Sequence, residues 1–294
     1  MSESVDLHIH SNKSSDGEYP PHEIVLLAKQ MDLRAISIAD HDSVAAYPEA
    51  LLEGEKAGIE VIPSVELTTR FDQREFHLLL PFVEWSHEIV IELVAEVARK
   101  RTNEAKARVE KLQKIGMDVR WEDVEMESGR FPPVGVTIAL ALLKRAKNKG
   151  DPIFKKYYDA KQDLFAPLRF YEDYLMQGRK AAVPRQNLSL EYVLQTAAKT
   201  GAVPVLSHPG AYFMQADKGD LSYLKEKGLE GIEVYTSYHN PRKTKKYKKI
   251  AEDLDLVPTA GSDFHGIMKP QVSFACISEG KYWMVEKLRE RQKH

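Results

Sequence analysis

Histidines in short segments that also carry carboxylates are the residues of this chain best suited to chemistry. Six of the ten histidines fall in such segments. Neutral imidazoles and carboxylates are the ligands that borderline divalent metals prefer in proteins. The pattern therefore indicates a metal-dependent hydrolase. The segments read DLHIH (6–10), ADHDS (39–43), VE (65–66), EFH (75–77), SHP (207–209) and GSDFH (261–265).

The first segment places two imidazoles on one face of a strand. His8 and His10 are two residues apart in an apolar run, and side chains alternate between the two faces along a strand. Asp6 shares their face. Two converging imidazoles form half of a site for a divalent ion, although hydrogen-bonded polar residues at a strand end would give the same pattern.

Further candidates recur at equivalent places, each directly after the apolar run of an expected strand. These candidates are His41, Glu66, His208, Asp263 and His265. In parallel barrels the loops at the carboxyl ends of the strands converge, and active sites are built there. His77 is the exception, because it lies early in its own run. A random scatter of polar residues would not favour one edge of several strands, so the set indicates a single site.

The elements that must position these side chains alternate at both ends of the chain. Strands are expected at 5–9, 34–39, 59–65, 76–82, 203–207, 231–236, 257–260 and 272–277, and helices at 21–31, 43–57, 189–200, 242–254 and 282–291. Such alternation indicates βα units and a parallel sheet or barrel. Between them the pattern is helical, beginning with a long helix at 87–115. We therefore predict an α/β barrel from 1–85 and 185–294, interrupted by a helical insertion subdomain at 86–184 that caps the substrate.

Bulk properties narrow the class further. Lysine plus arginine (42) nearly balance aspartate plus glutamate (44), so the net charge does not indicate nucleic acid or a membrane as a partner. The single cysteine, Cys276, excludes an intrachain disulfide, and its apolar surroundings predict burial. No basic-then-apolar leader and no apolar run of roughly 20 residues is visible, so we expect a cytoplasmic protein.

The motifs DLHIHS with a following SDG, ADHDS, VIPSVEL, EFHLL, SHPG and GSDFHG stand in this order. In this order they resemble the polymerase-and-histidinol-phosphatase (PHP) superfamily of metal-dependent phosphoesterases, over roughly 4–82 and 185–278. The resemblance implies a distorted (β/α)7 barrel that holds up to three divalent ions, with Mn, Fe and Zn all compatible with the ligand types. It implies that one ion binds His8, His10, Glu66 and Asp263, a second Glu66, His77 and His208, and a third Asp16, His41 and His265.

The same resemblance suggests catalytic roles for Asp263, His208 and His239. Attack on phosphorus would come from metal-bound hydroxide, and water, His208 or His239 would protonate the leaving oxygen. Asp6, Asp40 and Asp42 either hold imidazole N–H groups or cap loops, and the sequence does not choose between these roles.

The insertion resembles that of bacterial nucleoside 3′,5′-bisphosphate phosphatases, some relatives of which trim short RNA from the 5′ end. Arg101, Arg108, Arg130 and Arg185 are the candidates for phosphate binding, because a guanidinium matches phosphate oxygens. A solvated or ion-paired helix face explains Arg101 and Arg108 at least as well. One departure is that the Gly-Arg-Pro-His segment common in the subgroup is replaced here by VGVTIA at 134–139.

The residues 242–249 concentrate six cations in eight positions. They could form a positively charged surface that binds an oligonucleotide, although the solvated side of a surface helix is the more common explanation for such a run.

Our first hypothesis is therefore a phosphoesterase that hydrolyses a phosphate monoester of a small nucleotide, such as a 3′,5′-bisphosphate nucleoside, or the end of a short oligonucleotide. Alternatives are a phosphatase for another metabolite such as histidinol phosphate, and a noncatalytic PHP binding module. An amidohydrolase would leave Asp16, His41 and His265 without a role. We expect a small phosphorylated partner, no membrane and no obligate protein partner.

Overall fold

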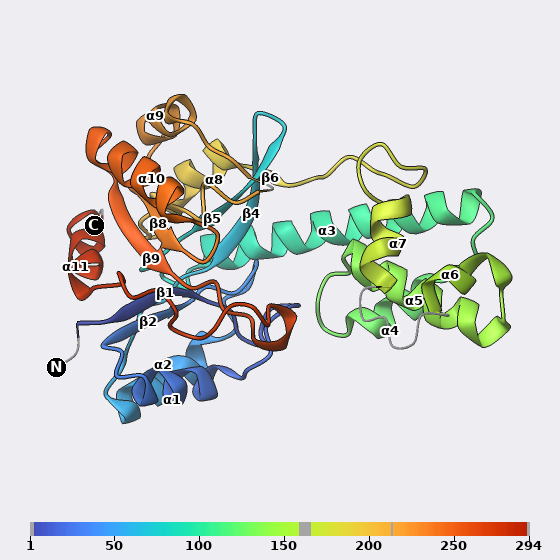
Figure 1. Cartoon of the computed structure of the whole chain (residues 1–294), viewed down its shortest axis with the longest axis horizontal. Coiled ribbons are helices and arrows are strands. Elements are labelled where there is room, and N and C mark those ends of the chain that lie inside the picture. Colours follow the sequence, from blue (N-terminus) through green and yellow to red (C-terminus); the bar gives the residue numbers. More distant parts are fainter. Residues whose placement is uncertain (1–2, 159–165, 213, 293–294) are drawn as a thin grey trace. The chain divides into compact units, whose positions relative to one another are not determined.

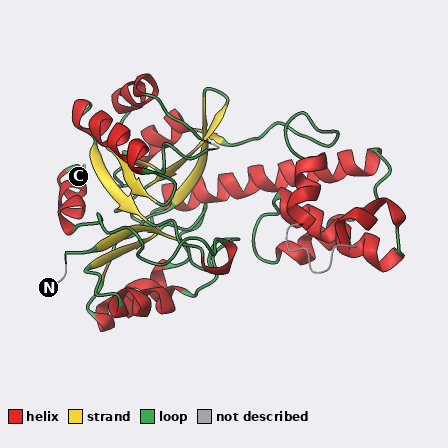
Figure 2. Cartoon of the chain, viewed as in Figure 1, coloured by secondary structure: helices red, strands yellow, loops and turns green. Residues whose placement is uncertain are grey.

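The computed structural model describes residues 3–158, 166–212 and 214–292, and these divide into two compact units (Figure 1). The first unit comprises Met1–Val94 and Leu188–His294, and the second comprises Ala95–Asn187. The first unit contains the strands, as Figure 2 shows, and the α/β class predicted from the sequence is confirmed. The predicted insertion, 86–184, overlaps the second unit.

Two sheets form the framework of the first unit. The smaller is parallel, with the order β1 (Val5–Ile9), β2 (Ala35–Ile38) and β3 (Glu60–Val61). The larger is mixed, and its order is β6 (Leu188–Ser189), β4 (Glu66–Phe71), β5 (Arg74–Leu79), β7 (Val205–Leu206), β8 (Gly231–Thr236) and β9 (Val257–Gly261).

Backbone bridges join the two sheets on both sides. Ile9 at the end of β1 bridges Phe264 just after β9, and His41 after β2 bridges Glu66 at the start of β4. The strands β4, β5, β7, β8, β9, β1 and β2 therefore succeed one another around a common centre. The result is a distorted barrel that ladder hydrogen bonds do not close completely.

Helices cover the outside of this framework. They are α1 (Pro21–Gln30), α2 (Tyr47–Ala57), α8 (Leu190–Ala197), α9 (Lys218–Glu226), α10 (Pro241–Asp253), α11 (Tyr282–Glu290) and the short η2 (Gly266–Met268). Proline occupies the first helical position of α1 and α10, where its missing N–H costs nothing. Gly58 ends α2 in the left-handed conformation that a C-cap requires. Buried aliphatic side chains such as Ile36 and Val257 form the core beneath the helices.

The β4–β5 hairpin is the main departure from the predicted pattern. The sequence predicted that a strand ends at Glu66, but β4 begins there, and β5 runs antiparallel to both β4 and β7. Asp72 and Gln73 form the two-residue turn with φ of 47° and 61°, as a type I′ turn needs. Because β5 runs backwards, its early residues lie where the parallel strands end. This explains why His77 appeared to be an exception.

The strand predicted at 272–277 is wrong. The segment consists of turns, with Ala275 at a φ of 54°, and Cys276 is exposed rather than buried. An apolar composition alone suggested a strand, and a short apolar run without alternation does not distinguish a strand from a buried turn segment. The expected helices and the other strands occur within about three residues of their predicted bounds, with two exceptions. Helix α2 begins four residues late, and the strand expected at 59–65 is only the two-residue β3, which ends four residues early.

The second unit is helical. Its elements are α4 (Trp121–Ser128), α5 (Gly135–Lys149), η1 (Pro152–Phe154), α6 (Lys155–Tyr158), α7 (Ala166–Tyr174) and the larger part of α3 (Glu88–Lys114). It has its own apolar core, in which Leu112, Leu142 and Phe170 are buried. Among the described residues, no helix combines the length and the apolar character of a membrane span.

Candidate metal centre

Four side chains from three parts of the chain converge at the carboxyl end of β1. They are His8 on β1, His10 directly after it, Glu66 at the start of β4 and Asp263 just after β9, and all four are buried. The Nε2 atoms of the two histidines lie 3.1 Å apart. Glu66 Oε2 lies 3.4 Å from each Nε2, and Asp263 Oδ1 lies 3.4 Å from His8 and 3.1 Å from His10.

These separations fit a bound cation. Ligands at 2.0–2.1 Å from a tetrahedral metal are about 3.3 Å from one another, since the edge of a tetrahedron is about 1.6 times its radius. Glu66 Oε2 and Asp263 Oδ1 are also buried without a hydrogen-bond donor. Buried carboxylate oxygens rarely lack a partner. The four atoms therefore have the chemistry and the spacing of a ligand set for a divalent ion.

Glu66 extends the cluster through its other oxygen. Glu66 Oε1 lies 3.2 Å from His77 Nδ1 and 3.2 Å from His208 Nε2. His41 approaches from the opposite side, with Nδ1 3.0 Å from Glu66 Oε2. Glu66 is thus in a position to bridge two cations, and His41, Glu66 and His77 form a second group with metal-site spacing.

A third group lies on the outer side of His10. Asp16 Oδ2 is 3.6 Å from His41 Nε2 and 3.5 Å from His265 Nε2. The ring of His10 stacks on that of His265 at 4.0 Å. His41 therefore contacts Glu66 through one ring nitrogen and Asp16 through the other. The structure brings all nine predicted ligands together around Glu66 and His10, although whether each one binds a metal stays a prediction.

The electrostatics differ among the candidate ligands. Burial acts to lower the pKa of His8 and of His41, but the charge of Glu66 and other nearby carboxylates outweighs it, so the pKa of His8 is well above its usual value and that of His41 rises to about 9. His10 and Asp263 show the opposite behaviour. Burial is the largest influence on the pKa of His10, and the charges of His265 and His41 add to it, so the pKa falls to about 4. Burial acts to raise the pKa of Asp263, but the charge of His8 and the adjacent His10 ring outweigh it and hold the pKa well below the usual range. A neutral imidazole beside an ionised carboxylate is the state that binds metal.

Glu233 lies in the site, and the sequence analysis assigned it no role. It is buried in the middle of β8, where its Oε1 accepts a hydrogen bond from His8 Nδ1 at 3.0 Å and its Oε2 accepts one from His208 N at 2.8 Å. The first bond fixes the His8 ring with Nε2 facing the other ligands. The signal was present in the sequence as a single carboxylate inside the apolar run GIEVY (231–235).

Asp6, Asp40 and Asp42 accept hydrogen bonds from the loops around the site. Asp6 accepts hydrogen bonds from the backbone of His8 and Ser262, and Asp42 accepts one from Thr68 N. Asp40 accepts hydrogen bonds from the backbone and hydroxyl of Ser11, both at 2.6 Å. Of the two roles considered for these carboxylates, these hydrogen bonds favour loop capping.

His239 is held by the backbone on both sides of its ring. Gly210 N donates to His239 Nε2 at 3.0 Å, and His239 Nδ1 donates to Val234 O at 2.9 Å. Its ring also stacks on Tyr247 at 4.9 Å. These contacts fasten the segment after β8 to the loop that carries His208. Both ring nitrogens of His239 are therefore engaged by backbone atoms.

Lys269 is a second residue that the prediction missed. Its ammonium pairs with Asp263 Oδ2, the oxygen directed away from the four-atom cluster. It also lies 4.7 Å from the centre of the Tyr238 ring, which in turn contacts the His208 ring at 4.9 Å. Lys269 therefore places a positive charge at the edge of the candidate centre.

The candidate phosphate-binding arginines all belong to the second unit. Arg108 is buried and paired with Glu104 at 2.6 Å, so its charge is already compensated. Arg130 lies over the Phe131 ring at 4.9 Å, and Arg185 donates to the Tyr171 hydroxyl at 3.5 Å. Arg101 is half-buried on α3. Substrate binding by these arginines stays a prediction.

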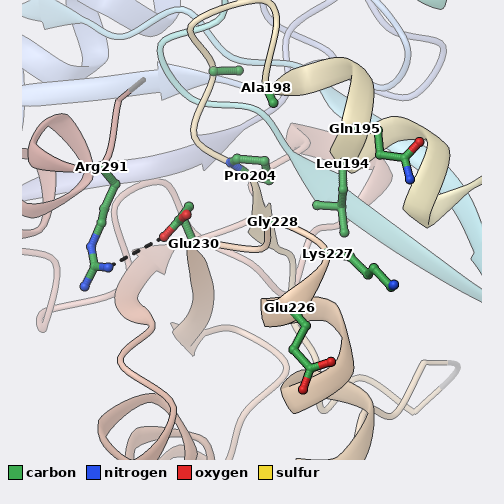
Figure 3. A pocket seen from close by; sticks show the side chains of 10 residues that line it. Leu194, Gln195, Ala198, Pro204, Glu226, Lys227, Gly228, Glu230 and Arg291 are labelled. Carbon is green, nitrogen blue, oxygen red and sulfur yellow. Dashed lines mark ion pairs between the residues drawn. The ribbon is translucent and has the colours of Figure 1, made fainter. Parts of the chain in front are cut away.

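A cavity of about 370 Å³ lies elsewhere in the first unit (Figure 3). Pro204 and Glu230, which line it, precede β7 and β8, whereas His208 follows β7. Arg291 points toward Glu230 across it at 3.7 Å. The cavity therefore lies at the opposite end of the strands and contains none of the candidate ligands.

A buried cluster of imidazoles and carboxylates at the carboxyl edge of a distorted α/β barrel defines a metal-dependent hydrolase. The sequence profile described as the PHP domain matches residues 6–171, more than half of the chain. The protein belongs to the PHP family, and it is a metal-dependent phosphoesterase, a hydrolase of phosphoester bonds. The resemblance seen in the sequence is thereby confirmed.

Individual relatives agree with this assignment. The chain is 26% identical over 266 residues to the 5′-3′ exoribonuclease Rnm of Escherichia coli K12, covering 88% of this chain and 84% of the relative. It is 23% identical over 270 residues to the 3′,5′-nucleoside bisphosphate phosphatase of Chromobacterium violaceum, covering 89% and 87%. The crystal structure of a putative metal-dependent phosphoesterase from Bifidobacterium adolescentis superposes with a TM-score of 0.76 at 25% identity, covering 100% of this chain and 98% of the other.

Proposed function

We propose that the protein hydrolyses a phosphate ester of a small nucleotide, such as a 3′,5′-bisphosphate nucleoside, or at the end of a short oligonucleotide. The observation that carries the proposal is the set of four buried atoms from His8, His10, Glu66 and Asp263 at 3.1–3.4 Å separations. Such a set concentrates positive charge once it is loaded with metal, and phosphate esters are the anions that this charge attracts.

The neighbouring groups support more than one ion. We propose up to three divalent ions, with Glu66 bridging the first two through its separate oxygens and Asp16, His41 and His265 holding the third. Mn, Fe and Zn all suit mixed imidazole and carboxylate ligands. When bound, these ions would supply an activated water and neutralise charge on the phosphoryl oxygens.

The side chains of this chain then have separate tasks. Glu233 keeps the His8 ring oriented, and Lys269 holds the second oxygen of Asp263 while adding positive charge at the rim. His239 would have to give up its contact with Gly210 N before it could donate a proton. We therefore assign protonation of the leaving oxygen to water, because His208 is itself a proposed ligand and its Nε2 faces Glu66 at 3.2 Å.

The relatives support the nucleotide part of the proposal. One bears the name of an exoribonuclease and another that of a bisphosphate phosphatase, and both align with most of this chain. The arginines of the second unit, Arg101, Arg108, Arg130 and Arg185, are the candidates for holding a second phosphate. Arg108 is the weakest of these candidates, because Glu104 already compensates its charge.

Phosphate release from a small panel with added Mn tests the proposal. The panel contains adenosine 3′,5′-bisphosphate, histidinol phosphate, p-nitrophenyl phosphate and a short single-stranded RNA. We expect the bisphosphate or the RNA to give the highest kcat/KM, and the Asp263→Asn variant to lose both metal and turnover. A preference for histidinol phosphate would reassign the substrate. Equal, feeble turnover of all four compounds would reject the nucleotide assignment.

A further inference from the structure

Helix α10 presents a row of cations that starts beside the candidate metal centre. We propose that this row is the docking surface for a single-stranded RNA whose terminal phosphate ester occupies the centre. The proposal rests on the function proposed above and extends it, because it makes an oligonucleotide, rather than a free nucleotide, the substrate for which the surface is built.

The two faces of α10 differ sharply in character. Tyr247, Ile250 and Ala251 are buried against the barrel. On the outer face Arg242, Lys245, Lys246 and Lys249 are all exposed and recur at the helical spacing i, i+3, i+4 and i+7, with Lys248 beside them. The cations therefore form one continuous stripe along the helix, hereafter the α10 stripe.

Acidic neighbours do not neutralise most of the α10 stripe. Within the part of the chain that the structure describes, no ion pair involves Arg242, Lys245 or Lys248. Lys249 pairs with Asp253 at 2.6 Å, at the far end of the helix. Like charges at this spacing repel one another. A chain of phosphates relieves this repulsion, and its binding releases the counterions condensed on the nucleic acid.

The start of α10 is fastened to the candidate centre. Gly210, two residues after His208, donates its N–H to His239 Nε2 and accepts a hydrogen bond from Lys243 Nζ at 2.7 Å. His239 directly precedes Asn240, which caps the helix. From there the α10 stripe runs along a helix of 13 residues, about 20 Å at 1.5 Å per residue. A mononucleotide held at the centre cannot cover this length, whereas several linked nucleotides can.

An aromatic side chain completes the combination that single-stranded nucleic acids bind. Tyr212 lies four residues after His208 on the same loop, and its side chain is 83% exposed. Proteins that bind single strands join a positively charged path for the backbone with aromatic faces on which bases stack. Tyr212 would supply the stacking face next to the terminal nucleotide, and the α10 stripe would supply the path.

Paired substrates and paired variants test the proposal. The triple variant Arg242→Gln/Lys245→Gln/Lys248→Gln removes three cations from the α10 stripe. The control triple Lys29→Gln/Lys199→Gln/Lys281→Gln removes three exposed cations from segments near the starts of β1, β2 and β7, at the opposite end of the strands. Both are assayed with adenosine 3′,5′-bisphosphate and with a short single-stranded RNA over a range of salt concentrations.

For the first triple we expect the ratio of kcat/KM on RNA to kcat/KM on the bisphosphate to fall at least about 10-fold. The slope of log KM against log salt for RNA should decrease by about 2, because three phosphate contacts on a single strand release about 0.7 counterions each. The control triple should match the wild type. Tyr212→Leu should raise KM for RNA by about 10-fold without altering the salt slope, since stacking releases no counterions.

The outcomes separate this proposal from the function on which it rests. If the wild type hydrolyses the bisphosphate but not RNA, or if both triples behave alike, the docking proposal fails and the phosphoesterase proposal stands. If the wild type hydrolyses neither nucleotide substrate, the proposed function fails first. Binding to phosphatidylserine vesicles that the first triple abolishes, with RNA hydrolysis unchanged, would assign the α10 stripe to an anionic membrane and overturn the proposal.

Discussion

Replacing Glu233 by glutamine should weaken metal binding while every proposed ligand remains in place. Glu233 is buried, and its two oxygens accept separate hydrogen bonds, from His8 Nδ1 at 3.0 Å and from His208 N at 2.8 Å. Glutamine has one acceptor oxygen and one amide group that can only donate. The variant can therefore satisfy one of the two donors and must direct its own N–H groups at the other.

The size of the effect follows from these contacts. A hydrogen bond to a charged group contributes about 1.5–3 kcal/mol. Partners that orient a metal-binding histidine typically change metal affinity by about 10–100-fold, which corresponds to about 1.4–2.7 kcal/mol. The two ranges agree, so we expect Glu233→Gln to bind Mn about 10–100-fold more weakly. Saturating metal should restore much of kcat, because the substituted side chain does not contact the substrate.

Competition with a fluorescent chelator measures the affinity, and phosphate release at increasing Mn measures the recovery of kcat. Glu252→Gln, which removes an exposed carboxylate from α10, is the matched control and should behave like the wild type. A Glu233→Gln protein that folds and binds Mn as tightly as the control would refute the idea that Glu233 orients His8. Loss of kcat that added Mn does not restore would indicate a direct part in the chemistry instead.

Three further predictions concern the same framework. Removing metal with EDTA should lower Tm by several degrees, because a metal ion at 100 times its Kd stabilises the native state by about 2.7 kcal/mol. Calorimetry that shows the same Tm with and without Mn would contradict a resident metal. Gly261→Ala should lose metal and turnover, because the added Cβ would collide with the Cβ of His8 and with Oε1 of Glu233. Gly219→Ala on α9 is the control. Wild-type metal content in Gly261→Ala would disprove this close packing. Tyr47→Phe should lower the free energy of unfolding, measured by urea titration, by about 1–3 kcal/mol. The buried Tyr47 hydroxyl donates a hydrogen bond to the carbonyl of Ile38 or of Ser64 and accepts one from Ser64 N. An unchanged unfolding midpoint would show that these bonds contribute nothing to stability.

The β4–β5 hairpin shows where prediction from the sequence reached its limit. The period-2 alternation placed His8 and His10 on one face correctly, since that relation depends only on the geometry of a single strand. The direction of β5 depends on the turn at Asp72 and Gln73, which lacks the glycine that usually marks such turns. His77 therefore looked misplaced in the sequence, although the antiparallel direction of β5 brings it to Glu66.

The sequence by itself determined the types of the candidate ligands, the order of the motifs and hence the family, because motifs and alternation are local properties of the chain. Only the tertiary structure showed that Glu233, 225 residues from His8, fixes the His8 ring, and that Lys269 binds the outer oxygen of Asp263. The tertiary structure likewise placed the start of α10 against the His208 loop. Strand order and register decide which distant side chains meet, and no spacing along the chain encodes them, so partners from separate strands become visible only once the barrel is assembled.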